Sequence, residues 1–188
     1  MRSNNSTFID EPHIMAHRGG DCFGVENSAT AIRASLQHGV DIIEVDVCKS
    51  SDGILFCYHG NWLQYVIPFF FFKKKYSKLK KRRPKLIILK HAIRLVGDKA
   101  ILFLDIKDTS ISPSELHDAL AGIKVSEVWV ASRDIELLRK IYINSVFRRR
   151  IYNMGLLNPR RRVSQLRDAG VSVVELFWWN FYSAIKVY

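Results

Sequence analysis

From residue 13 to residue 60 the chain reads HIMAHRGGDCFGVENSATAIRASLQHGVDIIEVDVCKSSDGILFCYHG. Three short apolar runs lie in this stretch, and ionisable residues stand where each run stops: His17-Arg18, then Glu44-Val45-Asp46, then His59. A charge that only solvates a surface has no reason to prefer the ends of strands. The spacing is typical of a parallel barrel, in which the chemistry collects at the carboxyl ends of the strands.

Apolar runs alternate with helical patterns along the rest of the chain. Most of the runs are rich in Val, Ile and Leu on both faces, as in strands that are covered on both sides. Strands that alternate with helices form βα units and a parallel sheet. The predicted strands are 13–16, 41–47, 54–58, 100–106, 127–131 and 171–176, with 151–154 as a seventh, and the predicted helices are 28–38, 85–96, 114–120, 135–142 and 160–169.

The size and composition of the chain indicate one globular domain over residues 1–188. The sequence is 48% hydrophobic, which suffices for a sizeable core and argues against disorder. Three cysteines form no paired framework, and no apolar run approaches the ~20 residues that span a bilayer. We expect a cytoplasmic protein that is at most peripheral to a membrane.

The net charge of +11 comes from one segment of the chain. Nine Lys or Arg residues and no acidic residue lie between Lys73 and Lys85, so the remainder carries only 11 − 9 = +2. We expect a basic loop insertion at about residues 65–85. Aromatic residues followed by clustered cations suit an anionic membrane surface, so residues Phe69 to Lys85 could bind one, or form a solvated loop without a partner. No nucleic-acid motif accompanies the charge, and we expect no nucleic-acid partner.

Two carboxylates, Glu44 and Asp46, stand two residues apart on one predicted strand and share one face of it. They repel each other there unless a cation or several donors meet them, and hard oxygen ligands suit Mg²⁺ or Ca²⁺. Asp105 and Lys107 repeat the spacing. Asp105 could be a third oxygen ligand, and Lys107 could hold an anion or pair with Asp105. A solvated pair at a strand end is the alternative for each motif.

Two histidines, His17 and His59, end strands that we expect to bracket the strand of Glu44 and Asp46. Two imidazoles that titrate near neutral pH could share acid and base roles, although a single histidine at a strand end is more often structural. Arg18 offers a planar fork for a phosphate group.

These motifs, in this order, resemble the first half of the glycerophosphodiester phosphodiesterase family. That family has a His-Arg-Gly strand end, a Glu-Asn-Thr-like helix start, a Glu-x-Asp strand, an Asp-Gly turn, a His-Asp strand end and a Glu-Ile-Lys strand, to which Leu104-Asp105-Ile106-Lys107 is similar. The resemblance is specific through about residue 60 and returns near residues 99–108. The family's Asp after the second histidine is Gly60 here, which predicts a less well oriented His59.

The resemblance implies a TIM (β/α)8-type barrel that hydrolyses glycerophosphodiesters to an alcohol and glycerol 3-phosphate with a divalent metal, Mg²⁺ or Ca²⁺. It implies His17 and His59 as the acid/base pair, Arg18 and Lys107 as phosphate-binding residues, and Glu44, Asp46 and Asp105 as metal ligands. In the family's usual mechanism the glycerol 2-hydroxyl attacks phosphorus, and water then opens the cyclic phosphate.

The length of the chain predicts an incomplete barrel, truncated at its C-terminal end. About 250 residues are usual for this fold, and the sequence offers about six or seven strands. An unclosed barrel exposes strand edges, so self-association is expected. The alternative to the enzyme is therefore a catalytically impaired homologue that binds phosphate or an anionic membrane surface.

Overall fold

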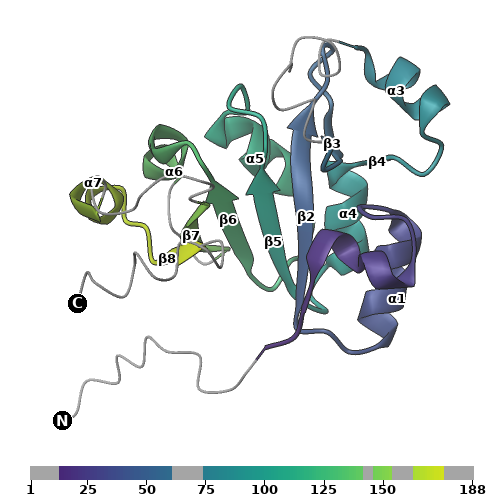
Figure 1. Ribbon diagram of the computed structural model, residues 1–188, viewed down its shortest axis with the longest axis horizontal. Coiled ribbons are helices and arrows are strands. Elements are labelled where there is room, and N and C mark those ends of the chain that lie inside the picture. Colours follow the sequence, from purple (N-terminus) through teal and green to yellow (C-terminus); the bar gives the residue numbers. More distant parts are fainter. Residues whose placement is uncertain (1–12, 61–73, 142–145, 154–162, 176–188) are drawn as a thin grey trace.

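The computed structural model describes residues 13–60, 74–141, 146–153 and 163–175, which form an α/β fold around one eight-stranded sheet (Figure 1). Six of the strands, β1, β2, β5, β6, β7 and β8, lie parallel to one another in that order. The strands are β1 Met15–Ala16, β2 Ile42–Lys49, β3 Leu55–Cys57, β4 Ile87–Ile88, β5 Ile101–Ile106, β6 Val128–Ser132, β7 Phe147–Asn153 and β8 Val173–Glu175.

Helices follow the strands in the alternation that the sequence predicts. Neighbouring helices touch, as α1 with α4 and α4 with α5, and so form a layer against the sheet. The helices are α1 Ala29–Gln37, α3 Tyr76–Arg82, α4 Leu89–Val96, α5 Pro113–Leu120, α6 Ile135–Lys140 and α7 Val163–Asp168, and short 3₁₀ turns, η1 His17–Gly19 and η2 Asp21–Phe23, follow β1. No helix in the described ranges is long and apolar enough to cross a membrane.

Alternation along the strands separates a helix-facing core from a second face that carries polar groups. Val45 of β2 and Leu104 of β5 belong to the large core that the helices cover. The other face begins with a smaller apolar cluster, which includes Phe103 and Trp129. Because side chains alternate across a strand, Glu44, Asp46 and Asp105 lie on this second face.

The sheet is open in the described part of the chain, where β1 pairs only with β2 and β8 pairs only with β7. The prediction of an α/β fold with an incomplete barrel of the TIM type is therefore confirmed for these residues.

The predicted parallel strand at residues 54–58 is instead antiparallel to β2, with Val47 opposite Cys57. Only five residues separate β2 from β3, and a parallel crossover needs a dozen or more. β5 occupies one edge of β2, so β1 and β3 share its other edge, one after the other. The prediction that the strands before His17 and His59 bracket β2 is therefore wrong. Both strands, β1 and β3, pair with the same edge of β2, one after the other.

The predicted basic loop at about residues 65–85 is wrong for its described part, residues 74–85, because Tyr76–Arg82 form helix α3. Leu79 is buried and packs with Cys48, Phe56 and Leu86. One apolar side chain among many cations gave no visible periodicity, yet it anchors the helix. Residues 87–88 form β4, paired with β3, so α4 begins at Leu89 rather than at Lys85.

The strand β7 begins at Phe147, before the predicted start at residue 151. The prediction was too short because three consecutive arginines interrupt the apolar pattern in the first half of the strand. Arg149 lies over the ring of Trp129, with 5.0 Å between its guanidinium carbon and the ring centroid. Arg150 donates to the backbone oxygens of Ile141 and Ala169. Arg148 is exposed, and the partly buried Arg149 and Arg150 have these partners, so the strand tolerates the three charges. Residues 142, 154, 160–162 and 176 of other predicted elements lie outside the described residues.

Candidate active site

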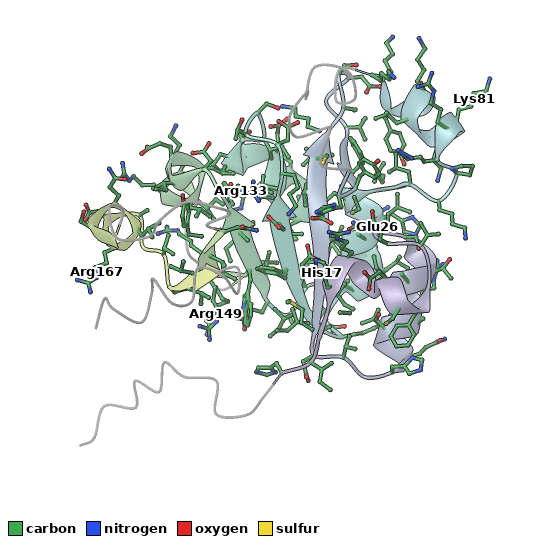
Figure 2. All side chains as sticks on the ribbon, viewed as in Figure 1. His17, Glu26, Lys81, Arg133, Arg149 and Arg167 are labelled. Atoms are coloured by element: carbon green, nitrogen blue, oxygen red, sulfur yellow. The ribbon has the colours of Figure 1, made fainter. Side chains whose placement is uncertain are left out.

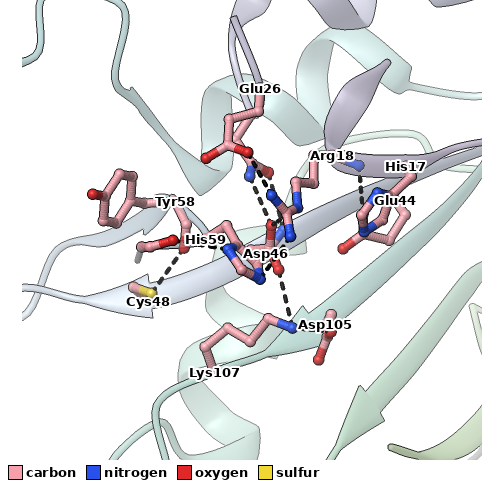
Figure 3. Close-up of polar contacts among 12 residues, drawn as sticks. His17, Arg18, Glu26, Glu44, Asp46, Cys48, Tyr58, His59, Asp105 and Lys107 are labelled. Carbon is pink, nitrogen blue, oxygen red and sulfur yellow. Dashed lines mark hydrogen bonds and ion pairs between the residues drawn. The ribbon is translucent and has the colours of Figure 1, made fainter. Parts of the chain in front are cut away.

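Three carboxylates meet at the carboxyl ends of two neighbouring parallel strands (Figure 3). Asp46 of β2 pairs in register with Asp105 of β5, and Glu44 lies two residues before Asp46 on the same face. The three side chains offer oxygen atoms within 4.8 Å of one another. They are only 2%, 1% and 6% exposed for Glu44, Asp46 and Asp105, so the alternative of a solvated strand end does not hold.

The electrostatics of this cluster favour a cation. Burial raises the pKa of Glu44 well above its usual range, and the neighbouring charge of Asp46 raises it further. The buried Oδ1 atom of Asp46 faces the ammonium group of Lys107 at 3.1 Å, so the carboxylates already attract a cation. A set of buried carboxylate oxygens fits a hard divalent ion.

Lys107 and Arg18 bring positive charge to the carboxylates. The Nζ atom of Lys107 lies 3.1 Å from Asp46 Oδ1 and contacts Asp105 directly. The Nε atom of Arg18 lies 3.9 Å from Asp46 Oδ2, and its Nη1 atom donates to Glu26 Oε2 at 2.7 Å. Two cations beside three carboxylates leave a formal net charge of −1, and Glu26, which pairs with Arg18, adds another negative charge.

The turn after β1 places Arg18 above the carboxylates. Arg18 has a φ of 51°, a left-handed conformation that costs free energy and that often marks functional sites. Its backbone N–H donates to Glu44 Oε2 at 2.5 Å, which accounts for that conformation. A Cβ atom at Gly19, whose φ is 75°, would lie 2.9 Å from Ile32, so the following position requires glycine.

Asn27 holds Asp46 from the same turn. Its Nδ2 atom donates to Asp46 Oδ2 at 2.8 Å, and its Oδ1 atom accepts from the Asp46 backbone N–H at 3.0 Å. Asn27 is 2% exposed and has a φ of 56°. The paired bonds fix the orientation of the carboxylate.

His59 is oriented by a backbone oxygen. Its Nδ1 atom lies 2.8 Å from the carbonyl oxygen of Gly60, which can only accept, so Nδ1 carries the proton. The other ring nitrogen, Nε2, is then the acceptor for Arg18 Nη2, 2.8 Å away. The carbonyl oxygen of Gly60 thus gives His59 an orienting contact although the family's Asp is absent at this position.

His17 lies at the open side of the cluster. Its Nε2 atom is 3.9 Å from Glu44 Oε2, and its side chain is 58% exposed. All seven predicted site residues thus form one connected group: His17, Arg18, Glu44, Asp46, His59, Asp105 and Lys107.

Several residues of the site were missed by the sequence reading. Glu26 and Asn27 stand in the quoted motif and match the Glu-Asn-Thr-like helix start of the family, but the sequence analysis assigned neither of them a role in the site. Asn153, which donates to Asp105 Oδ2 at 3.3 Å, comes from the distant strand β7 and had no local signal. A cavity of about 330 Å³ adjoins the cluster, and Arg133 and Thr109 line it together with His59, Asp105 and Lys107.

Comparison of the sequence with known proteins identifies relatives of its N-terminal part. Residues 17–69 match the model of the glycerophosphoryl diester phosphodiesterase family. Glycerophosphodiester phosphodiesterase GDPD6 of Arabidopsis thaliana is 40% identical over 48 residues, which cover 26% of this chain and 13% of that protein. GDPD4 of the same plant is 40% identical over 55 residues, which cover 29% of this chain and 17% of that protein. The matches thus span less than a fifth of either plant protein.

Comparison of the structure extends the likeness to nearly the whole chain. A phosphodiesterase of Oleispira antarctica, solved in complex with the product sn-glycerol-3-phosphate, has a TM-score of 0.69 at 20% identity, over 93% of this chain and 80% of that one. A glycerophosphodiester phosphodiesterase proposed for Galdieria sulphuraria has a TM-score of 0.71 at 20% identity, over 94% and 81% of the two chains. Residues 17–69 are thus similar to the glycerophosphoryl diester phosphodiesterase family, and the chain shares the fold of solved glycerophosphodiester phosphodiesterases.

Proposed function

We propose that this chain hydrolyses glycerophosphodiesters to an alcohol and glycerol 3-phosphate with the help of a divalent metal. One observation carries the proposal: three buried carboxylates, two cations and two imidazoles meet at one end of the sheet. The product complex of the Oleispira relative supports the same substrate class.

Glu44, Asp46 and Asp105 would hold the metal, Mg²⁺ or Ca²⁺. The donor set fits, because it consists of three buried carboxylates whose oxygen atoms lie within 4.8 Å of one another. When bound, the ion would neutralise charge on the phosphate.

Arg18 and Lys107 would bind the phosphate group. Arg18 now donates to His59 Nε2 and to Glu26. A phosphate oxygen is a stronger partner for guanidinium than a neutral imidazole is. We expect substrate to draw the Nη2 donor of Arg18 away from His59, which would leave Nε2 able to take up a proton.

His59 and His17 would then move the protons. In the first step the glycerol 2-hydroxyl oxygen bonds to phosphorus and its proton passes to one imidazole. The bond from phosphorus to the alcohol oxygen breaks, and the second imidazole protonates that oxygen. In the second step water bonds to phosphorus, the bond to the 2-oxygen breaks, and the protons pass in the reverse direction, which leaves glycerol 3-phosphate.

Release of glycerol 3-phosphate from glycerophosphocholine, with and without EDTA, tests the proposal. His59→Ala should lower kcat by roughly 10²–10⁴-fold, as loss of an acid/base group does. His38→Ala is the matched control, since that imidazole is exposed at the end of α1 and should leave turnover unchanged. Wild-type turnover in the His59 variant, or in EDTA, would contradict the mechanism.

A second candidate function is binding to an anionic membrane surface through the basic segment. Lys75, Lys78, Lys81, Arg82, Arg83 and Lys85 are exposed, and Lys81 points away from the sheet on the outer side of α3 (Figure 2). Each cation near an anionic bilayer contributes about 1 kcal/mol. Sedimentation with vesicles of phosphatidylserine and phosphatidylcholine should show binding that salt removes. Equal binding to pure phosphatidylcholine would contradict it.

A further inference from the structure

A second cavity, of about 460 Å³, lies beside the active site. Its wall includes Val25, Glu26, Tyr58, Arg83, Lys85 and Leu86. Glu26 joins the cavity to the reaction centre, because its carboxylate accepts the hydrogen bond from Arg18 at 2.7 Å. Tyr58 directly precedes His59, and Figure 3 shows its ring pointing away from the carboxylates while His59 points toward Arg18. The cavity is therefore next to the place that a bound phosphate would take.

The segment after α3 forms a fixed wall of this cavity. The carbonyl oxygen of Leu86 accepts hydrogen bonds from Lys80 Nζ at 2.6 Å and from the Tyr76 hydroxyl at 3.3 Å. Leu86 also pairs with Ser28 at the start of α1. These contacts, with the buried Leu79 behind them, hold residues 83–86 in place. The wall is built into the fold and is suited to a binding site.

The charge of the wall favours an anion. Arg83 and Lys85 are exposed at the cavity, and the guanidinium carbon of Arg83 lies 4.8 Å from the centroid of the Tyr58 ring. Among the described residues that line the cavity, Glu26 is the only acidic one, and it pairs with Arg18. Val25 and Leu86 supply apolar surface. A mostly apolar cavity with two cations at its wall suits a small polar molecule that carries a negative charge.

We propose that this cavity receives the alcohol half of the diester and selects alcohols that bear a second anionic group, such as a phosphate monoester. The inference rests on the proposed function. A diester has two arms at phosphorus, and two cavities adjoin the Arg18–His59 pair: Glu26, the partner of Arg18, lines one, and His59 lines the other. The cavity with Asp105 and Lys107 takes the glycerol arm, and Arg83 and Lys85 meet the charge on the other arm.

The test compares glycerophosphoinositol 4-phosphate with glycerophosphoinositol, which differ only in the second anion. The wild type should prefer the phosphorylated substrate, and the ratio of the two kcat/KM values should fall roughly 10–100-fold in Arg83→Gln and Lys85→Gln, through KM. Arg83→Lys should retain part of the preference. Lys81→Gln removes a charge from α3 outside the cavity and should leave the ratio unchanged.

The outcomes separate this inference from the proposed function. Hydrolysis without preference, or a ratio that Arg83→Gln and Lys85→Gln leave unchanged, overturns the inference alone. If the chain hydrolyses neither substrate, the proposed function fails. Calorimetry with free inositol 4-phosphate then tests whether the cavity binds an anion. Binding that both variants weaken supports the cavity as an anion site, and no binding to the wild type overturns it.

Discussion

Asn27 shows how one side chain outside the predicted ligand set can control the site. Its two hydrogen bonds to Asp46 fix a carboxylate that we assign to the metal. Partners of this kind usually contribute 10–100-fold to metal affinity. We expect Asn27→Gly to weaken Mg²⁺ binding by about that factor in calorimetry, because glycine keeps the left-handed backbone and removes only the side chain. Unchanged affinity would remove Asn27 from the site.

Glu44 provides the direct test of the metal ligands. Its carboxylate is buried, and its pKa is raised by burial and by the neighbouring charge of Asp46. We expect Glu44→Ala to abolish calorimetric binding of both Mg²⁺ and Ca²⁺ in the concentration range where the wild type binds. Glu127→Ala, on a carboxylate outside the cluster, is the control. Equal binding by the wild type and Glu44→Ala would exclude Glu44 as a ligand.

At the scale of elements, helix α3 has one buried side chain, that of Leu79. Leu79 is 1% exposed, and truncation of a buried leucine costs about 2–5 kcal/mol. We therefore expect Leu79→Ala to lower the free energy of unfolding in urea by about this amount, whereas the exposed Ser77→Ala on the same helix should not. If Leu79→Ala leaves the free energy of unfolding unchanged, helix α3 does not contribute to the stability of the fold.

Helix α5 begins with a capping box that is linked to β2. Glu115 accepts from the Ser112 backbone and pairs with Lys49 at 2.7 Å. Burial raises the pKa of Glu115, but the hydrogen bonds from Lys49 and Ser112 outweigh it, so the pKa lies below the ordinary 4.5. The carboxylate therefore stabilises the fold above about pH 4.5, and this contribution is lost as the pH falls through the lowered pKa.

Glu115→Gln keeps the cap and removes the charge. We expect it to cost about 0.5–1 kcal/mol at pH 7 and nothing once the wild-type carboxylate is protonated, as urea unfolding at both pH values would show. Glu136→Gln, in an exposed ion pair with Arg139, is the control and should cost less. If Glu115→Gln still lowers the free energy of unfolding at acidic pH, Glu115 stabilises the fold through packing and hydrogen bonds rather than through its charge.

At the scale of the whole molecule, the open sheet is the dominant feature. Within the described residues β8 has a partner on one edge only, and Val173 and Val174 are 40% and 38% exposed. We propose that the chain self-associates through this edge, and we expect light scattering to report a mass that rises with concentration. Val174→Lys should reduce it, since a charge blocks edge pairing, whereas Ser77→Lys should not. A monomer at all concentrations would contradict this.

The single-domain organisation over residues 1–188 also belongs to this scale and stays a prediction. The main core unites residues from β1 to α7, so we expect one cooperative transition by circular dichroism and by fluorescence. Two separate transitions would show that the chain contains two units that unfold independently.

The sequence predicted most of the fold because its signals are local. Apolar runs on both faces marked β2, β5 and β6, and Glu44, Asp46 and Asp105 followed from strand ends meeting at one edge. The failures have physical causes. The direction of β3 depended on a connection too short for a crossover, and α3 depended on the one side chain Leu79. Asn153 reaches the site only through the folded sheet.

The hydrogen bond from His59 to the carbonyl oxygen of Gly60 determines what substitutions at position 60 can reveal. Every amino acid carries this oxygen, so no substitution at position 60 deletes it. A mutational scan would report only how well each residue tolerates the φ of 82°, and so would favour glycine without revealing why. An orienting group made of backbone is thus robust to mutation and hidden from alignments, and homologues without an acidic residue here can be misjudged as inactive.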